Sequence, residues 1–135
     1  MYTVLSTALY KGKCPFHSNC MEGLAAGPAI EGRYGKKAFD LKDVPEVWEL
    51  EAEYIAKALV NYILILSPQR IVLGGGVMHQ EQLFPLVRKK TVELLNGYMN
   101  TKEIENIDSY IIPPSLNDNQ GVMGCIRLAL DALEA

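Results

Sequence analysis

The sequence has 135 residues, of which 49% are apolar and 21% charged, and its formal net charge is −3. These values are those of one globular domain or of a piece of a larger one. The acidic balance argues against a nucleic-acid-binding surface, because no basic cluster is longer than Arg88-Lys89-Lys90. The longest apolar run, Tyr62–Leu66, is far shorter than the ~18 residues that cross a membrane.

The cysteines and the first residues of the sequence indicate the compartment. Three cysteines at unequal spacings do not make a disulfide framework, and the first ten residues lack the charged start of a secretory signal. Thiols are kept reduced in the cytoplasm. We therefore expect a cytoplasmic protein with free cysteines.

The first thirty residues predict two short elements around a loop. Tyr2–Leu9 is rich in β-prone side chains and predicts an edge strand. A compact loop follows at Cys14–Cys20, and the spacing of apolar residues predicts a short helix over Met21–Ile30. Gly23 and Gly27 leave one side of that helix bare, so we expect backbone or a flat ligand to pack closely against it.

A long helix is predicted after an irregular or weakly helical connection over Glu31–Lys42. Asp43 can cap this helix and Pro45 suits its first turn, while Ser67-Pro68 ends it after Leu66. Apolar residues repeat along it at spacings of three and four and form one stripe: Trp48, Ala52, Ile55, Leu59, Ile63 and Leu66. Its second half is apolar nearly all round, which indicates the core or an oligomer interface.

Two short strands and two more helices are predicted in the second half of the chain. Arg70–Leu73 predicts a buried strand that ends in three glycines, and Ser109–Ile112 predicts a second strand. A helix over Glu81–Asn96 should bury one face, and a last helix should run from about Asn117 to Leu133. The inward residues of the first of these helices are expected to be Leu83, Phe84, Val87, Thr91, Leu94 and Leu95. This alternation implies right-handed crossovers and parallel strands, so the sheet should belong to a larger α/β fold.

The pattern Cys14-x-x-His17-x-x-Cys20 places two thiols and one imidazole within seven residues. Zinc binds such ligands tetrahedrally, and the short spacing lets one loop supply several of them. Structural zinc sites have four protein ligands, however, and the remaining candidates, His79 and Cys125, are remote in sequence. Two interpretations stay open: a metal-binding loop, or a reduced loop with an incidental histidine.

Glu22 and the triple glycine each have a ligand-binding and a structural interpretation. Glu22 directly follows the cysteine loop and could accept hydrogen bonds from a polyol, or it could complement the dipole of the helix that it starts. Gly74, Gly75 and Gly76 follow a predicted strand, at the end where ligands of α/β sheets bind. They could equally form a plain tight turn.

The start of the last helix has two interpretations as well. Residues Asn117–Gly121 offer free backbone N–H groups and the positive end of a helix dipole, which suit a phosphate. Gly121 and Gly124 could instead allow a helix to pack closely on a strand. Cys125 falls within an apolar pattern and is expected to be a buried small residue. The pattern consists of Val122, Ile126, Leu130 and Leu133.

Together, four stretches resemble the carboxyl-terminal half of bacterial fructokinases of the ROK (repressor, open reading frame, kinase) family of sugar kinases. They are Cys14–Ile30, Trp48–Ala56, Leu66–Met78 and Asp118–Gly124. The resemblance covers nearly the whole chain from Gly12 onward. It implies an atypical start over residues 1–11 and a ROK sugar-kinase domain over residues 12–135, with a zinc loop at 14–20 and a nucleotide-side loop at 73–78.

The resemblance implies the helix-rich carboxyl-terminal lobe of an actin-like ATPase (ribonuclease H-like) fold, an α/β fold with a small, mainly parallel sheet. It also implies that Cys14, His17 and Cys20 bind a structural Zn²⁺. In the family a histidine just upstream completes this site and touches the sugar. Glu22 would contact a sugar hydroxyl.

On the nucleotide side, the resemblance implies that Gly74, Gly75 and Gly76 lie against the adenine and ribose of ATP, which is bound with Mg²⁺. The segment around Asn119 and Gly121 would help to close that pocket. The family's phosphate-binding motif, catalytic aspartate and Glu-x-Gly-His motif are absent from these 135 residues.

We therefore expect the carboxyl-terminal portion of an ATP-dependent fructokinase, with no turnover as an isolated chain. The expected partners are fructose or another hexose such as glucose, ATP and ADP, and a second copy of the chain in a dimer. The alternative is a non-enzymatic zinc-binding module that self-associates. A sugar-responsive repressor is disfavoured, because the sequence has neither a helix-turn-helix nor a basic patch.

Overall fold

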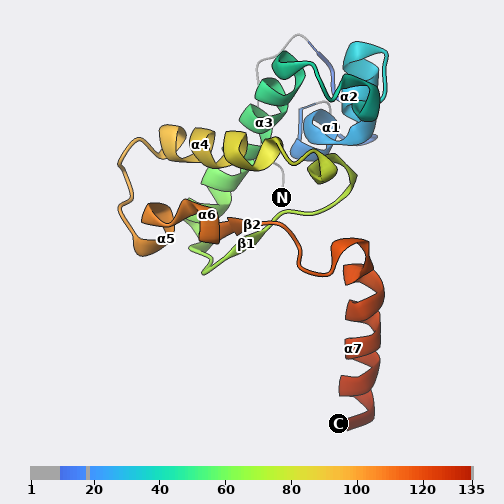
Figure 1. The fold of residues 1–135 in the computed structure, drawn as a ribbon, viewed down its shortest axis with the longest axis vertical. Coiled ribbons are helices and arrows are strands. Elements are labelled where there is room, and N and C mark those ends of the chain that lie inside the picture. The colour runs from blue at the N-terminus through green and yellow to red at the C-terminus, as the bar shows by residue number, and fades with distance from the viewer. Residues whose placement is uncertain (1–9, 18, 135) are drawn as a thin grey trace.

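The computed structural model describes residues 10–17 and 19–134 of the chain, and Figure 1 shows most of its helices gathered around one long helix. The edge strand expected at Tyr2–Leu9 lies outside the described residues. Within the described part, no helix combines the length and the hydropathy that a membrane span requires.

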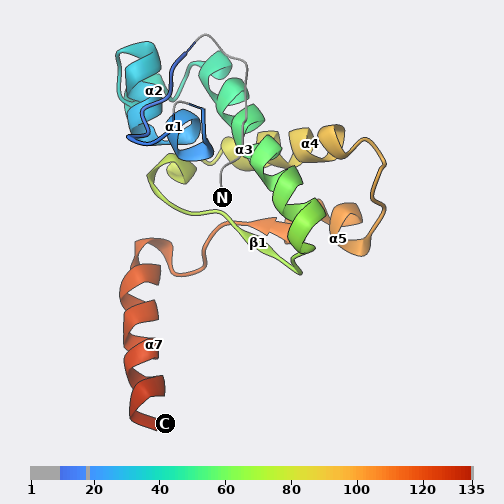
Figure 2. The ribbon, with the colours of Figure 1, turned by 180° about the vertical axis from the view of Figure 1, so that it is seen from behind.

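The long helix is α3 (Pro45–Leu66), which runs through the middle of the molecule (Figure 2). Pro45 occupies its first turn, where the missing N–H costs no hydrogen bond. The residue at the cap is Val44 and no side chain caps the helix, so the expected capping by Asp43 is wrong. The helix ends at Ser67, which adopts a left-handed φ of 44°, and Pro68 prevents a further helical turn.

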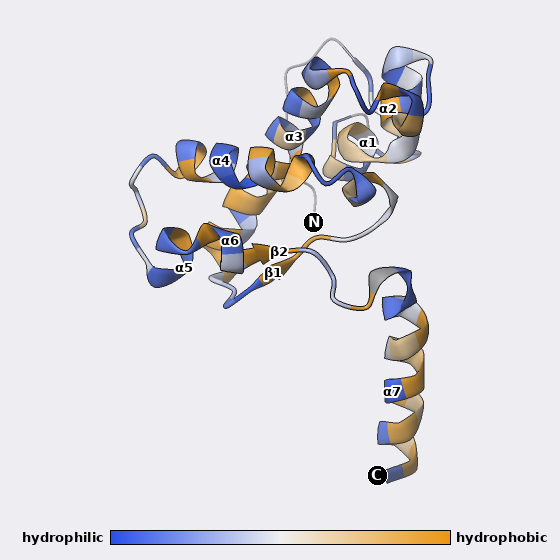
Figure 3. Ribbon diagram, in the orientation of Figure 1, coloured by the Kyte–Doolittle hydropathy of each residue, from blue (hydrophilic) through white to orange (hydrophobic). Residues whose placement is uncertain are grey.

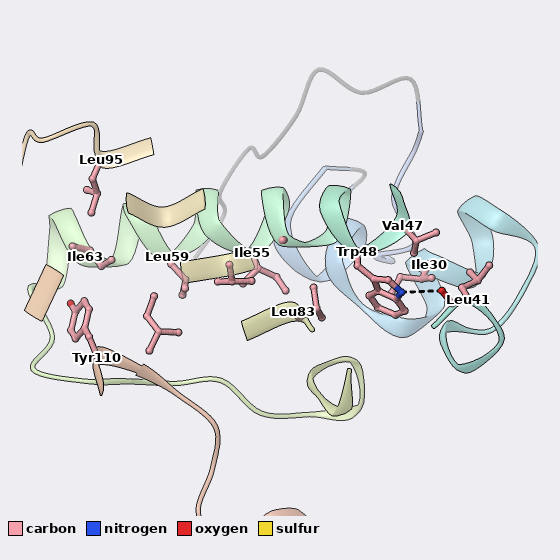
Figure 4. Close-up of a cluster of buried hydrophobic side chains, with 13 residues drawn as sticks. Ile30, Leu41, Val47, Trp48, Ile55, Leu59, Ile63, Leu83, Leu95 and Tyr110 are labelled. Atoms are coloured by element: carbon pink, nitrogen blue, oxygen red, sulfur yellow. Dashed lines mark hydrogen bonds between the residues drawn. The ribbon is translucent and has the colours of Figure 1, made fainter. Parts of the chain in front are cut away.

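The core lies between α3 and α4 (Leu83–Leu95), as the sequence pattern predicts. Figure 4 shows Ile55, Leu59 and Ile63 in a row along α3, with Leu83 and Leu95 of α4 beside them. All five side chains are buried. Because a fully buried large apolar side chain contributes ~1.5–3 kcal/mol, this contact is a major source of stability.

Trp48 closes the amino-terminal end of this core. Its ring is 1% exposed, and its Nε1–H donates to the backbone carbonyl of Leu41 at 2.9 Å (Figure 4). At the other end of α3 the burial prediction fails, because Leu66 is 63% exposed. Leu94 of α4 is also exposed, contrary to prediction.

Strands β1 (Ile71–Val72) and β2 (Ile111–Ile112) form a parallel two-stranded sheet, with Ile71 opposite Ile111 and Val72 opposite Ile112. This sheet confirms the predicted helix-rich α/β fold with a small parallel sheet. Ile111 is completely buried, but Val72 is 57% exposed. The expectation that the first strand is fully buried is therefore wrong, because no described element covers the side of the sheet that carries Val72.

Arg88 of α4 attaches the sheet to the core. Its Nε and Nη2 donate to the carbonyl of Ile111 at 2.9 Å and 2.7 Å, and its Nη1 lies 3.0 Å from Asp108 Oδ1. Two single-turn helices, α5 (Lys102–Glu105) and α6 (Ile107–Tyr110), precede β2. The second strand is thus shorter than predicted, because Ser109 and Tyr110 belong to α6.

Two helices, α1 (Met21–Ala25) and α2 (Gly27–Tyr34), replace the single helix expected over Met21–Ile30. The chain is extended at Ala26. In a continuous helix Pro28 would have no N–H to donate to the carbonyl of Leu24, and its ring would clash with that carbonyl, whereas Pro28 is tolerated in the first turn of α2. The stretch expected to be an irregular or weakly helical connection contains the rest of α2 and a 3₁₀ turn at Ala38–Leu41.

Helix α7 (Gln120–Glu134) begins after a 3₁₀ turn at Asn117–Asn119 and projects away from the other elements (Figure 1). Its start and end confirm the predicted last helix, but all its residues are exposed. Figure 3 shows its apolar side lying bare along its length. The expected burial of Cys125 is therefore wrong. Of the two interpretations of Gly121 and Gly124, close packing on a strand does not occur among the described residues, because a Cβ at either position would meet no other element within 4 Å.

Candidate functional site

The cysteine loop brings its three candidate ligands together. The sulfur atoms of Cys14 and Cys20 and a ring nitrogen of His17 all lie within 4.8 Å of one another, and Cys14 Sγ is 3.9 Å from His17 Nδ1. Ligand atoms around a tetrahedral zinc lie about 3.6–3.8 Å apart when Zn–S is about 2.3 Å and Zn–N about 2.0–2.1 Å. A small inward movement of this loop would therefore give three corners of a tetrahedron.

The first turn of α1 holds the loop in this shape. Cys20 is the N-cap residue of α1, and its sulfur accepts a hydrogen bond from the Gly23 N–H at 3.3 Å. Gly23 has to be small, because a Cβ there would lie 3.1 Å from Cys14 Cβ. The bare side predicted for this helix thus packs against the loop at Gly23, whereas Gly27 has nothing within 4 Å.

The environment of Cys14 favours its thiolate. The backbone N–H of Phe16, which donates to Cys14 Sγ at 3.5 Å, and then the N–H of His17 lower the pKa of the Cys14 thiol below its ordinary value. The thiolate is the form that binds metal ions. His79 and Cys125 do not join the cluster among the described residues.

Glu22 lies beside the cysteine loop, as its sequence position predicts. It lines a hollow of about 470 Å³ together with Cys14, His17 and Cys20. Its side chain is exposed. The carboxylate and the three candidate metal ligands thus border one open space, where a small polar molecule could reach both.

Gly74 and Gly75 of the triple glycine border a second, larger groove of about 670 Å³. Gly75 has a φ of 98°, a conformation that residues with side chains rarely adopt. The wall opposite Gly74 and Gly75 is formed by the segment that leads into α7, through Asp118 and Gln120. Asn119 and Gly121, the residues singled out in the sequence, do not line the groove, although Asp118 and Gln120 beside them do.

Two side chains that line this groove, those of His79 and Arg88, were not expected there from the sequence. His79 Nε2 lies 2.9 Å from Asp118 Oδ1 and so links the glycine loop to the segment before α7. Arg88 also lines the groove, but its guanidinium is already engaged by Ile111 and Asp108.

A third groove of about 500 Å³ lies between the two candidate sites. Met21 and Ala25 of α1 line one side, Leu73 and Gly74 line the other, and Ile55 of α3 lies between them. The elements expected to contact the sugar and the nucleotide thus face one another across a common groove, even though they are about fifty residues apart in sequence.

A buried pair of ionisable side chains, Glu51 and Arg33, lies between α2 and α3 and was missed in the sequence. Glu51 of α3 has no exposed surface, and its Oε2 lies 3.8 Å from Nη1 of Arg33 on α2. Burial raises the pKa of Glu51 to about 8, although the positive charge of Arg33 opposes this rise. Glu51 lies between Trp48 and Ile55 on the buried face of α3, so helical periodicity alone could have identified it.

Comparison with known proteins shows which family this chain belongs to. Residues 3–132 match the ROK family. The chain belongs to the ROK family. It is 52% identical over 128 residues to a protein of Bacillus subtilis named "Putative fructokinase", and 45% identical over 125 residues to the fructokinase of Pediococcus pentosaceus. These alignments cover 94% and 93% of the chain but 43% and 42% of the two relatives, so the ROK chain spans less than half of their length.

The fold agrees with this assignment. A crystal structure of a "putative sugar kinase" from Cytophaga hutchinsonii superposes on the ROK chain with a TM-score of 0.65 and a sequence identity of 16%. The superposition covers 92% of the chain and 48% of the sugar kinase. It supports the predicted carboxyl-terminal lobe of a kinase fold, and the candidate sites all lie within the residues matched to the ROK family.

The buried pair predicts an unusual dependence of stability on pH. Because the folded chain holds a proton on Glu51 up to pH ~8 while the unfolded chain releases it near pH 4.5, stability should fall as the pH rises between these values. The slope is at most about 1.4 kcal/mol per pH unit. Urea unfolding at several pH values should show this fall in the wild type and a smaller one in Glu51→Gln. Parallel curves for the two proteins would contradict the prediction.

Proposed function

We propose that this chain is the carboxyl-terminal portion of an ATP-dependent fructokinase, which transfers the γ-phosphoryl group of ATP to a hydroxyl of fructose when the rest of the protein is present. The observation that carries the proposal is the identity of 40–52% to four proteins with fructokinase in their names, over at least 89% of the chain. A Thermotoga maritima glucokinase is only 25% identical, which disfavours glucose as the preferred hexose.

We assign the two sides of the middle groove to the two substrates. Glu22 would accept a hydrogen bond from a fructose hydroxyl, since its carboxylate borders the open hollow at the cysteine loop. Gly74, Gly75 and Gly76 would lie against the adenosine of ATP, because a backbone without side chains allows close approach. The segment at Asn119 and Gly121 would close the nucleotide side, with Asp118 and Gln120 providing the wall.

Phosphoryl transfer also needs groups that hold the phosphates and Mg²⁺ and accept the proton of the hydroxyl. We place those groups in the part of the relatives that this chain does not span, which is 57–58% of their length. The domain over residues 12–135 would thus provide one wall of the active site. The isolated chain should therefore have no kinase turnover.

We further propose that Cys14, His17 and Cys20 hold a structural Zn²⁺. The donor set fits zinc, since two sulfurs and one imidazole nitrogen lie within 4.8 Å of one another in an open loop. When bound, the ion would supply no chemistry to phosphoryl transfer and would only fix the loop that adjoins Glu22. The reduced thiols that such a site needs fit the cytoplasmic location expected from the sequence.

Metal analysis tests this site. The chain purified with zinc should hold about one ion, and Cys14→Ser should lose it, because the remaining cysteine and histidine make a weak site. Cys125→Ser is the matched control, since Cys125 is exposed on α7 and lies outside the cluster. Equal zinc content in Cys14→Ser and the wild type would contradict the assignment, as would the absence of zinc from all three proteins.

A chimera tests the kinase function. In the Bacillus subtilis relative, the 128 aligned residues would be replaced by this chain, and ADP release would be measured with fructose and Mg-ATP. Turnover is expected with fructose and not with the isolated chain. Glu22→Gln in the chimera should raise the KM for fructose by about tenfold or more, because it weakens a charged hydrogen bond of ~1.5–3 kcal/mol.

Glu31→Gln provides the control for this substitution, since Glu31 is an exposed glutamate on α2 that lines none of the three grooves. Its KM for fructose should equal that of the unmodified chimera. A folded chimera that turns over glucose in preference to fructose would change the proposed hexose. One that turns over no hexose would overturn the proposed kinase function.

The bare apolar side of α7 favours a second candidate, a zinc-binding module that self-associates. Val122, Ile126 and Leu133 are 63%, 48% and 85% exposed, and exposed apolar stripes commonly mark protein interfaces. In a complete kinase this stripe would be covered by the missing portion, whereas an isolated chain could cover it with a second copy. An inactive chimera together with a discrete dimer of the isolated chain in sedimentation would favour this candidate.

A further inference from the structure

Helix α1 carries two residues of the candidate site and is too short to hold its own shape. Cys20 is its N-cap and Glu22 lies in its first turn. The helix has only five residues, and forming so short a helix is unfavourable because few of its backbone hydrogen bonds can close. Its C-cap residue, Ala26, is extended, so the left-handed turn that usually pairs the last carbonyls is missing.

Groups from outside α1 pair the carbonyls at its carboxyl end instead. The N–H of Lys13 donates to the carbonyl of Gly23 at 2.9 Å. Nη2 of Arg33 donates to the carbonyl of Leu24 at 2.7 Å. The second bond is charge-assisted and comes from a different helix, so it connects α1 to the core of the protein.

Three tyrosine rings and one carboxyl group surround the guanidinium of Arg33. Its guanidinium carbon lies 4.8 Å, 5.7 Å and 5.1 Å from the ring centres of Tyr10, Tyr34 and Tyr54, and its side chain is only 9% exposed. Its Nη1 also lies 3.8 Å from Oε2 of the buried Glu51. Since Tyr54 and Glu51 both belong to α3, the guanidinium is fixed relative to the central helix.

We propose that Arg33 is a positioning residue, which fixes Cys20 and Glu22 at the candidate site by holding the carboxyl end of α1 against α3. Side chains of α3 contact the guanidinium of Arg33, and the guanidinium donates a hydrogen bond to the carbonyl of Leu24. Helix α1, which contains Leu24, thereby keeps Cys20 and Glu22 at the candidate site. The role of Glu22 toward the sugar rests on the proposed function, but the placement of Cys20 does not.

The alternative is that Arg33 only adds to global stability. The two roles differ in how the thiol of Cys20, which is 7% exposed, becomes accessible to reagents. If Arg33 positions α1, its loss opens α1 locally while the α3–α4 core stays folded. If Arg33 is merely structural, Cys20 becomes accessible only when the whole chain unfolds.

Alkylation of the metal-free chain by iodoacetamide separates these cases, with each cysteine followed by peptide mass spectrometry. Arg33→Met keeps the length of the side chain and removes its donors. Its Cys20 should react about tenfold faster than in the wild type, because a charge-assisted hydrogen bond that holds α1 is lost. Cys125, which is already exposed, should react at an unchanged rate in the same sample. Arg33→Lys, which keeps a positive donor, should restore part of the protection.

Leu95→Ala is the matched control, because Leu95 is buried in the α3–α4 core and its loss lowers global stability. In this variant the Cys20 rate should stay within about twofold of the wild type, since opening of α1 does not need the core to unfold. The proposal is overturned if Arg33→Met leaves the Cys20 rate unchanged. It is also overturned if the rate rises equally in Arg33→Met and Leu95→Ala.

Two features keep this experiment decisive when a variant does not fold or when the proposed function fails. If Arg33→Met does not fold, as judged by the near-ultraviolet signal of the buried Trp48, Arg33→Lys is measured by the same criteria. Because the chain is free of metal, a failure of the proposed zinc site or of the proposed kinase function leaves the result for Arg33 unaffected.

Discussion

The packing of α4 against α3 is the contact on which the other elements depend. α3 has apolar residues on one continuous face, and Leu59 and Ile63 belong to the same buried core as Leu83 and Val87 of α4. The two-residue strands and the single-turn helices are too short to be stable alone, so they form where this core gives them a surface. Arg88, which binds the carbonyl of Ile111, shows how directly the sheet is attached to α4.

The same core explains how residues distant in sequence share one groove. The middle of α3 supports α1, which follows the cysteine loop, through Tyr54 and Ala58 packed against Leu24. The remainder of the core supports the strand that leads to the triple glycine. Ile55 lies between the two groups, where it lines the groove that separates them. A rigid helix of 22 residues thus sets the separation between the proposed sugar and nucleotide sides.

The sequence could predict those elements whose burial partners lie within this chain. The stripe of α3 from Trp48 to Ile63 and the parallel pairing of the two strands depend on residues that the chain contains. The cysteine loop was predicted equally well, because its spacing and the adjacent glycine are local features. The break at Ala26 was missed, although Pro28 provided a signal for it, because a proline inside a helix removes a backbone hydrogen bond.

The wrong predictions of burial share one physical cause. Leu66, Val72 and Cys125 follow apolar patterns, and such a pattern shows that the side chains favour burial against another surface. It does not show whether that surface belongs to this chain. Since the chain spans less than half of its relatives, such a surface can lie outside it. Glu51 illustrates the opposite case, because an ionisable residue on the buried face of α3 contradicts the usual rule that such groups lie at the surface.

Native-state amide hydrogen exchange on the isolated chain tests most directly whether the α3–α4 core organises the structure. Amides of α3 between Ile55 and Ile63 should exchange only through global unfolding, together with those of α4. Amides in the middle of α7 should exchange at least about a hundredfold faster, because a helix of 15 residues without packing is only marginally stable. Equal protection of α7 and α3, or opening of α3 while α4 stays protected, would contradict this view of the fold.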